Sequence, residues 1–192
     1  MPKYIKVKPV GIDVPIQKQQ ERLWAALKSK WGLADDAYIS YGRCYRNQSP
    51  SGYKPQMYVP GTTLGDEYEN LFIDDRAAVT TFFGAENETF TNGIMTANVH
   101  LIVIVDLTKI GKTTQHRPDA EARMDVFESM KFKPGFEATG VVVGIDKVFA
   151  EYTAWRSTTG GVNYTDMHPK HCFRINFQLT YIPQTICIPV FN

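Results

Sequence analysis

Val99-His-Leu-Ile-Val-Ile-Val-Asp106 is the longest apolar run in the chain. Six of its eight residues are valine, isoleucine or leucine, and β-branched side chains favour a pleated strand over a helix. Because the apolar residues are consecutive rather than alternating, we expect protein to cover both faces of this strand. A run of about eight residues is too short to span a bilayer as a helix. The sequence therefore predicts a central, buried strand.

One helix is predicted before this strand in the sequence and one after it. The apolar residues of the first, residues 13–31, fall on one stripe at helical spacing: Ile16, Leu23, Trp24, Leu27 and Trp31. Asp13 suits its N-cap and Gly32 its C-cap. The second helix, residues 118–131, begins with Pro118, which suits a first helical position, and carries acidic residues in its first turn, where the helix dipole favours them.

Two further strands are predicted at residues 140–152 and 170–182. Apolar and polar residues alternate strictly from Phe173 to Tyr181, as expected for a half-buried antiparallel strand. Gly144 interrupts the earlier strand and predicts a bulge or a close backbone approach. Together with a central strand at 96–107, these elements predict an α+β fold: a mainly antiparallel sheet with both helices packed on its apolar side.

The length of 192 residues fits a single domain, residues 1–192. We expect an extended N-terminal arm at 1–11 and an irregular insert at about 47–92. Short strands are predicted before it at 38–41 and within it at 57–59 and 78–83. The insert and the residues just before it contain aromatic and methionine side chains of the kind enriched at interfaces: Tyr45, Tyr53, Met57, Tyr58 and Tyr68. The arm and the insert are therefore predicted to contact another chain.

Charge and cysteine content exclude several classes of protein. The balance of 21 basic and 20 acidic residues gives a net charge of +1, unlike the basic stripe of a nucleic-acid binder or a polybasic membrane-surface patch. Three cysteines (Cys44, Cys172 and Cys187) do not form the pattern of a disulfide scaffold and indicate a reducing compartment. The N-terminus lacks the apolar core of a signal peptide. We expect the protein to stay where it is made.

The loop at residues 108–117 is one candidate for chemistry. Gly111-Lys112-Thr113 resembles part of a phosphate-binding loop, in which backbone amides and a lysine hold phosphates. The first glycine of that motif would be residue 106, which is Asp, and the helix begins several residues late, at Pro118. We therefore predict that Lys112 has no catalytic duty. A nucleotide-binding enzyme that uses the 108–117 loop remains the alternative function.

Other candidate clusters favour structural interpretations. His168, His171 and Cys172 could belong to a zinc site, but a structural zinc needs four ligands, and neighbouring strand residues point to opposite faces. A hydrogen-bonded histidine at a strand entrance explains them better. The acidic pairs Asp66-Glu67 and Asp74-Asp75 lack the spacing of a calcium loop. The residues therefore predict no catalytic group, no cofactor site and no metal site.

The element order resembles that of the tail-terminator and neck-ring proteins of tailed bacteriophages, small α/β subunits that close into rings between portal and tail. The resemblance rests on that order, on the segment Val99–Ile110 and on the alternating strand at 170–182. It covers roughly half of the chain. The insert at 47–92 is longer than a minimal member of these families needs.

The resemblance implies a structural virion protein rather than an enzyme, located in the phage neck or tail and assembled in the host cytoplasm. It implies a homo-oligomeric ring that acts as a tail terminator or head–tail joining protein. Such a ring contacts other neck, portal-adaptor or tail proteins and encloses the DNA channel without sequence-specific binding. It implies no cofactor and no membrane partner.

Overall fold

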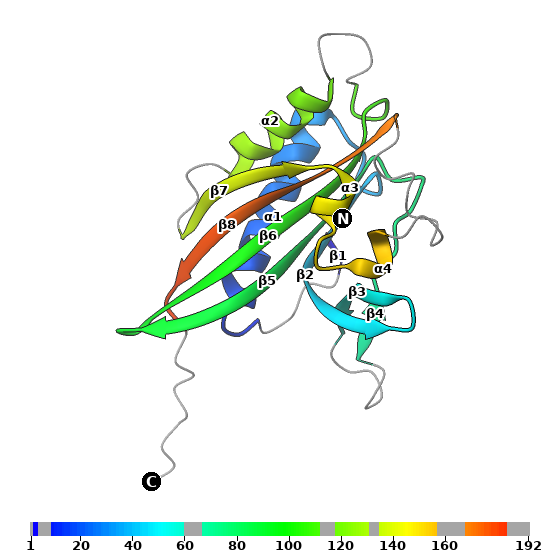
Figure 1. The fold of residues 1–192 in the computed structure, drawn as a ribbon. Helices are drawn as coiled ribbons and strands as arrows, with labels where there is room; N and C mark the ends of the chain where they lie inside the picture. The colour runs from blue at the N-terminus through cyan, green and yellow to red at the C-terminus, as the bar shows by residue number, and fades with distance from the viewer. Residues whose placement is uncertain are drawn as a thin grey trace.

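The computed structural model describes residues 2–3, 9–59, 67–111, 118–130, 135–156 and 168–183. It folds into one twisted sheet with helices on both faces (Figure 1). The elements in chain order are β1 (Pro2–Lys3), α1 (Asp13–Trp31), β2 (Tyr38–Ser49), β3 (Gly52–Tyr58), β4 (Tyr68–Asn70), β5 (Val79–Thr91), β6 (Ile94–Asp106), α2 (Pro118–Met130), β7 (Phe136–Val143), α3 (Ile145–Val148), α4 (Thr153–Arg156) and β8 (Lys170–Tyr181).

The strand order is β4-β3-β2-β5-β6-β8-β7, with β1 beside β2. Every pairing is antiparallel except β1 with β2 and β2 with β5, which are parallel. The predicted central strand lies within β6, which pairs along its length with β5 and β8. The mainly antiparallel α+β sheet is thus confirmed.

Apolar side chains cover both faces of β6, as its consecutive apolar residues predicted. On the first face, α1 and α2 pack over odd-numbered β6 residues such as Leu101 and Val103. On the second face, Ile102 and Ile104 pack with residues of the α3–α4 segment. The two long helices are joined by polar contacts as well, since the Trp31 indole N–H donates to the Asp125 carboxylate at 2.7 Å.

The predicted helices are confirmed, with one correction at a cap. Gly32 takes a left-handed conformation (φ 62°) at the C-cap of α1, as expected for a glycine there. Asp13 is the first helical residue, and Ile12 takes the N-cap position. The prediction of an Asp13 N-cap was therefore wrong. The Asp13 carboxylate instead faces Arg43, with an oxygen 3.9 Å from the guanidinium.

The predicted strand at 140–152 is wrong beyond residue 143. β7 begins earlier, at Phe136, and ends at Val143. Gly144 has a φ of 90°, a conformation that side chains disfavour, and it turns the chain from β7 into α3. The apolar residues that follow, Val148 and Phe149, are buried against the second face of the sheet. They form a cover on the sheet rather than a strand within it.

The expectation of an irregular insert at 47–92 was also wrong for its described residues that form strands, whereas residues 71–78 contain no helix or strand. β2 runs on to Ser49 and makes a hairpin with β3, while β5 continues to Thr91. Asn92 and Gly93 both have positive φ, 52° and 82°, which is the type I′ turn that closes a two-residue hairpin. The β5–β6 hairpin therefore projects from one end of the sheet (Figure 1).

Part of the predicted N-terminal arm lies on its own chain. Pro2 and Lys3 pair in parallel with Ser40 and Tyr41 of β2. Residues 4–8 of the arm lie outside the described residues, and so do residues 60–66 of the insert. Among the described helices, none combines the length and the apolar content needed to cross a membrane.

Candidate functional site

The open strand β7 is the first candidate. It pairs with β8 on one side and, within the described part of the chain, with no strand on the other. Glu137 is its only charged residue, and Val141 and Val143 are each 46% exposed. Edge strands are usually protected by charge, proline or bulges, and β7 has one register shift, between Ala138 and Gly140. The backbone beyond this bulge can accept a further strand.

The opposite end of the sheet carries the aromatic edge, which consists of Tyr45, Tyr58, Tyr68 and Phe72. The Tyr68 ring packs edge-on against Tyr45 and Tyr58, with ring centroids 5.6 and 5.5 Å apart. Tyr68 is 43% exposed and Phe72 is 67% exposed. Grouped aromatic side chains of this kind are typical of binding surfaces.

Two residues of the predicted contact set lie elsewhere. Met57 is buried in the second core cluster, so it cannot contact another chain in this fold. Tyr53 packs under the guanidinium of Arg46, which lies 3.8 Å from the ring centroid. β7 and the aromatic edge of β3 and β4 are at opposite ends of the strand order and on opposite sides of the molecule (Figure 1).

A polar groove lies on the second face of the sheet. One row of paired residues runs across four strands as Gly84, His100, Asn176 and Gly140. The His100 ring lies over Gly84, because a Cβ added there would be 2.2 Å from the imidazole Nε2. Four further polar residues line the groove, Glu86, Asn98, Thr139 and Arg174, together with the apolar Val99 and Phe177.

Arg174 in this groove is neutralised by Glu151 behind it. Arg174 forms an ion pair with Glu151 and donates from Nε to the Asn176 amide oxygen at 2.5 Å. Burial, with the nearby positive charge of Arg174, lowers the pKa of His100 to about 4, so the imidazole is neutral at pH 7. Its Nε2 lies 3.3 Å from the Tyr152 hydroxyl, within hydrogen-bond distance. Burial alone would raise the pKa of Glu151, but the hydrogen bond from Arg174 holds it below its ordinary value.

This cluster was missed by the sequence analysis. His100 stands inside the apolar run, and Arg174 is one of the polar residues of the alternating strand predicted at 170–182. Glu151 and Tyr152 come from a segment that was predicted to be strand. A neutral histidine bonded to a buried phenol, beside a balanced ion pair, fixes the α3–α4 segment to the sheet.

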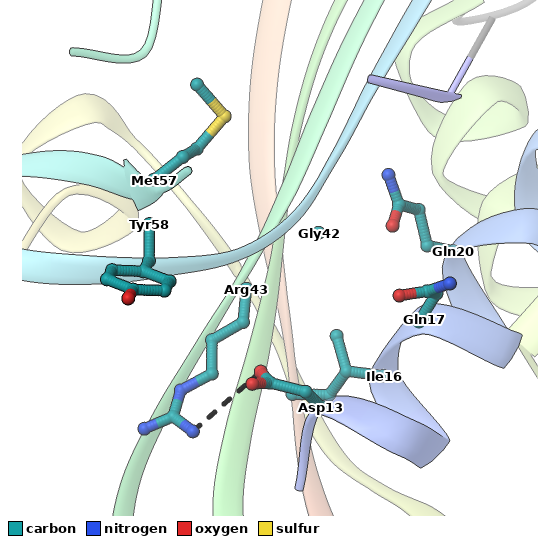
Figure 2. Close-up of a pocket in the computed structure, with 8 residues that line it drawn as sticks. All are labelled: Asp13, Ile16, Gln17, Gln20, Gly42, Arg43, Met57 and Tyr58. Carbon is teal, nitrogen blue, oxygen red and sulfur yellow. Dashed lines mark ion pairs between the residues drawn. The ribbon is translucent and has the colours of Figure 1, made fainter. Parts of the chain in front are cut away.

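A second polar hollow lies between α1, β2 and β3 (Figure 2). Arg43 reaches across it toward Asp13, and on its other side lies 3.6 Å from Glu88 of β5. Glu88 also accepts a 2.8 Å hydrogen bond from the Tyr181 hydroxyl. Burial, with the adjacent Glu88 carboxylate, raises the pKa of Tyr181 to about 12. These contacts tie the start of α1 to the ends of β5 and β8.

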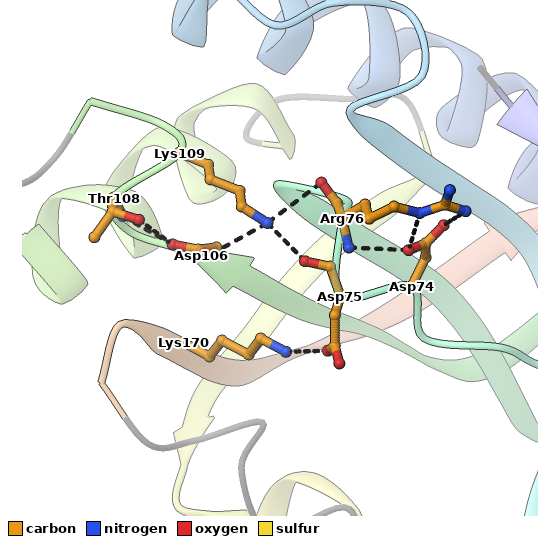
Figure 3. A network of polar contacts seen from close by, with 7 residues as sticks. All are labelled: Asp74, Asp75, Arg76, Asp106, Thr108, Lys109 and Lys170. Atoms are coloured by element: carbon orange, nitrogen blue, oxygen red, sulfur yellow. Dashed lines mark hydrogen bonds and ion pairs between the residues drawn. The ribbon is translucent and has the colours of Figure 1, made fainter.

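A third cluster joins the ends of β6 and β8 to the loop that precedes β5 (Figure 3). Asp106 accepts hydrogen bonds from the backbone N–H and the hydroxyl of Thr108 at 3.0 and 2.6 Å. Lys109 donates to the Asp75 carbonyl at 2.6 Å, and Lys170 forms an ion pair with the Asp75 carboxylate. Asp106, at the position where a phosphate loop has glycine, thus closes a turn.

The described residues that the sequence analysis considered as metal ligands make structural contacts in the fold. His171 and Cys172 point to opposite faces, as predicted: His171 accepts a 2.9 Å hydrogen bond from Arg123, and Cys172 is buried in the second core. Asp74 pairs with Arg76 at 2.9 Å. Lys112, Asp66 and Cys187 lie outside the described residues.

The described residues contain no group of three or more histidine, cysteine, aspartate or glutamate side chains placed to hold a metal ion. Neither a scan against protein-family models nor a search of curated proteins found a match to this chain.

Proposed function

We propose that this chain is a structural subunit that assembles with copies of itself into a closed ring, as the tail-terminator and neck-ring proteins of tailed bacteriophages do. The observation that carries the proposal is β7, an eight-residue strand that has no partner on its outer side among the described residues. It has one charged residue and two half-exposed valines. Such an edge is a template for pairing with another chain. Glu137 and the bulge protect only the first half of β7, so residues 140–143 lack the protection that a protein functioning alone would be expected to have.

The arrangement of exposed apolar residues supports a ring rather than a two-fold dimer. The aliphatic strand β7 and the aromatic edge lie at opposite ends of one sheet, and the two surfaces differ in shape and chemistry. A contact between two different surfaces is head-to-tail, and head-to-tail contacts either close into rings or continue as filaments. A subunit that joins two parts of a virion needs the closed form.

The place in the virion is supported by the order of elements. A helix, a group of strands, the central strand, a second helix and two late strands follow one another in this chain, and the resemblance to neck and tail rings rests on this order. The net charge of +1 suits a wall around DNA that does not hold the phosphates strongly. The proposal therefore places the ring in the neck or tail, next to portal-adaptor or tail proteins.

Native mass spectrometry of the full chain tests this function. We expect one dominant species whose mass is a whole-number multiple, three or greater, of 21.8 kDa and is unchanged on moderate dilution. A protein that stays monomeric at every concentration, with or without candidate neck and tail proteins, would contradict the proposal. A ladder of masses without an upper limit would indicate a filament instead.

A further inference from the structure

We infer that the ring closes by pairing β7 of one copy with β4 of the next copy, so that the sheet continues from subunit to subunit. The inference rests on the proposed function, because it names the two surfaces that form the ring contact. A second copy of this chain therefore occupies the open β7 edge. Three features of the fold support it.

The first feature is strand direction. Following the observed pairings from β4 across the sheet, β4, β2, β5 and β8 run one way, while β3, β6 and β7 run the other way. Neighbouring copies around a ring axis keep the same orientation. Placed edge to edge in that orientation, β7 of one copy therefore runs antiparallel to β4 of the next. Antiparallel pairing is the commoner and slightly more stable arrangement.

The second feature is the face on which the exposed apolar residues lie. Val141 and Val143 pair with Ile175 and Phe173, whose side chains belong to the core beneath α1 and α2. At the other edge, Tyr68 pairs with Tyr58, next to Met57 on the second face, so the tyrosines point to the first face. In a continuous sheet the two valines and Tyr68 would lie on the same face. Aromatic and β-branched residues are a favourable cross-strand combination.

The third feature is the position of charge. β4 contains Glu69 and β7 contains Glu137, and like charges directly opposite each other disfavour pairing. Glu137 lies at the start of β7, whereas the half-exposed valines lie at its end. Pairing of β4 with residues 141–143 therefore brings the apolar parts together and keeps the two glutamates apart.

Charge substitutions on each edge test the inference. Val143→Glu alters only the β7 edge, and Tyr68→Glu alters only the aromatic edge, at positions that are already half-exposed. Phe72→Glu, at a position 67% exposed, is a second variant of the aromatic edge that leaves the packed tyrosines in place. Phe90→Glu is the matched control, because Phe90 is 64% exposed near the tip of the β5–β6 hairpin. Each protein is compared by native mass spectrometry and by thermal unfolding.

Each edge variant alone is expected to be a folded monomer, with subunit association weakened on the order of 100-fold by the unpaired charge. An equimolar mixture of Val143→Glu and Tyr68→Glu is expected to form a one-to-one dimer and stop. In that mixture one intact β7 can meet one intact aromatic edge. The Phe90→Glu protein is expected to form the wild-type ring.

Two results would overturn the inference while leaving the ring intact. A Val143→Glu protein that still forms the wild-type ring would show that β7 is not the contact. Loss of assembly in Val143→Glu, with normal assembly of both Tyr68→Glu and Phe72→Glu, would show that β7 does not meet the aromatic edge. A wild-type protein that is monomeric throughout would instead contradict the proposed function itself.

Discussion

Replacing Gly84 with alanine is expected to destabilise the fold by about 2–4 kcal/mol. The added Cβ would lie 2.2 Å from His100 Nε2 and 2.7 Å from the Tyr152 hydroxyl. His100 is 3% exposed, so its ring has little room to move. Overpacking of a buried site costs about 1–3 kcal/mol, and disturbing the hydrogen bond between His100 and Tyr152 adds about 1 kcal/mol.

Urea unfolding at one fixed protein concentration measures this loss, because assembly makes apparent stability depend on concentration. Gly140→Ala is the matched control: Gly140 lies in the same cross-strand row, and an added Cβ there meets nothing within 4 Å. It is expected to change stability by less than about 1 kcal/mol. In the Gly84→Ala/His100→Ala double variant the two costs should be less than additive. Equal stability of Gly84→Ala and Gly140→Ala would refute the reasoning.

Three further predictions concern the core, the pH response and the 108–117 loop. Ile102→Asp places an unpaired carboxylate at a fully buried position of β6, which costs several kcal/mol, so the variant is expected to be absent from the soluble fraction. The pKa of His100 falls from 6.5 to about 4 on folding. This shift contributes about 3 kcal/mol to the free energy of unfolding. The contribution is complete above pH 6.5 and decreases as the pH falls toward 4. His100→Gln should flatten the unfolding free energy between pH 6.5 and about 5.5, above the ordinary pKa values of carboxyl groups; an unchanged slope would assign it to other groups. Lys112→Ala is expected to keep fold and assembly, and ATP or GTP binding that this substitution removes would favour the alternative enzyme.

Elements with a strong local pattern could be predicted from the sequence. In the apolar run around Val103 and in the alternating segment from Phe173 to Tyr181, each side chain's face of the sheet follows from its position along its own strand. The identity of the neighbouring strands does not alter it. The stripe of α1 likewise required only its own helical spacing. Asn92-Gly93 was a local signal for the β5–β6 hairpin that the sequence analysis did not use.

Features that depend on distant pairing could not be predicted in this way. The parallel placement of β2 beside β5 and the edge position of β7 follow from strand order, which no local pattern encodes. His100 meets Tyr152 only because the segment after Gly144 folds back over the second face of the sheet. The groove and the open β7 edge arise at this level. Three residues of the aromatic edge, Tyr45, Tyr58 and Tyr68, were predicted from the sequence as contacts, but their position at the end of the sheet opposite β7 was not.

Electron microscopy of the purified full-length protein, carried to a reconstruction that resolves strands, tests the central claim most directly. We expect a closed ring of identically oriented copies in which β7 of each subunit lies antiparallel to β4 of the next. A two-fold dimer joined through β7, or a ring in which β7 faces solvent, would contradict the inferred contact. Particles the size of a single 21.8 kDa subunit would contradict the ring.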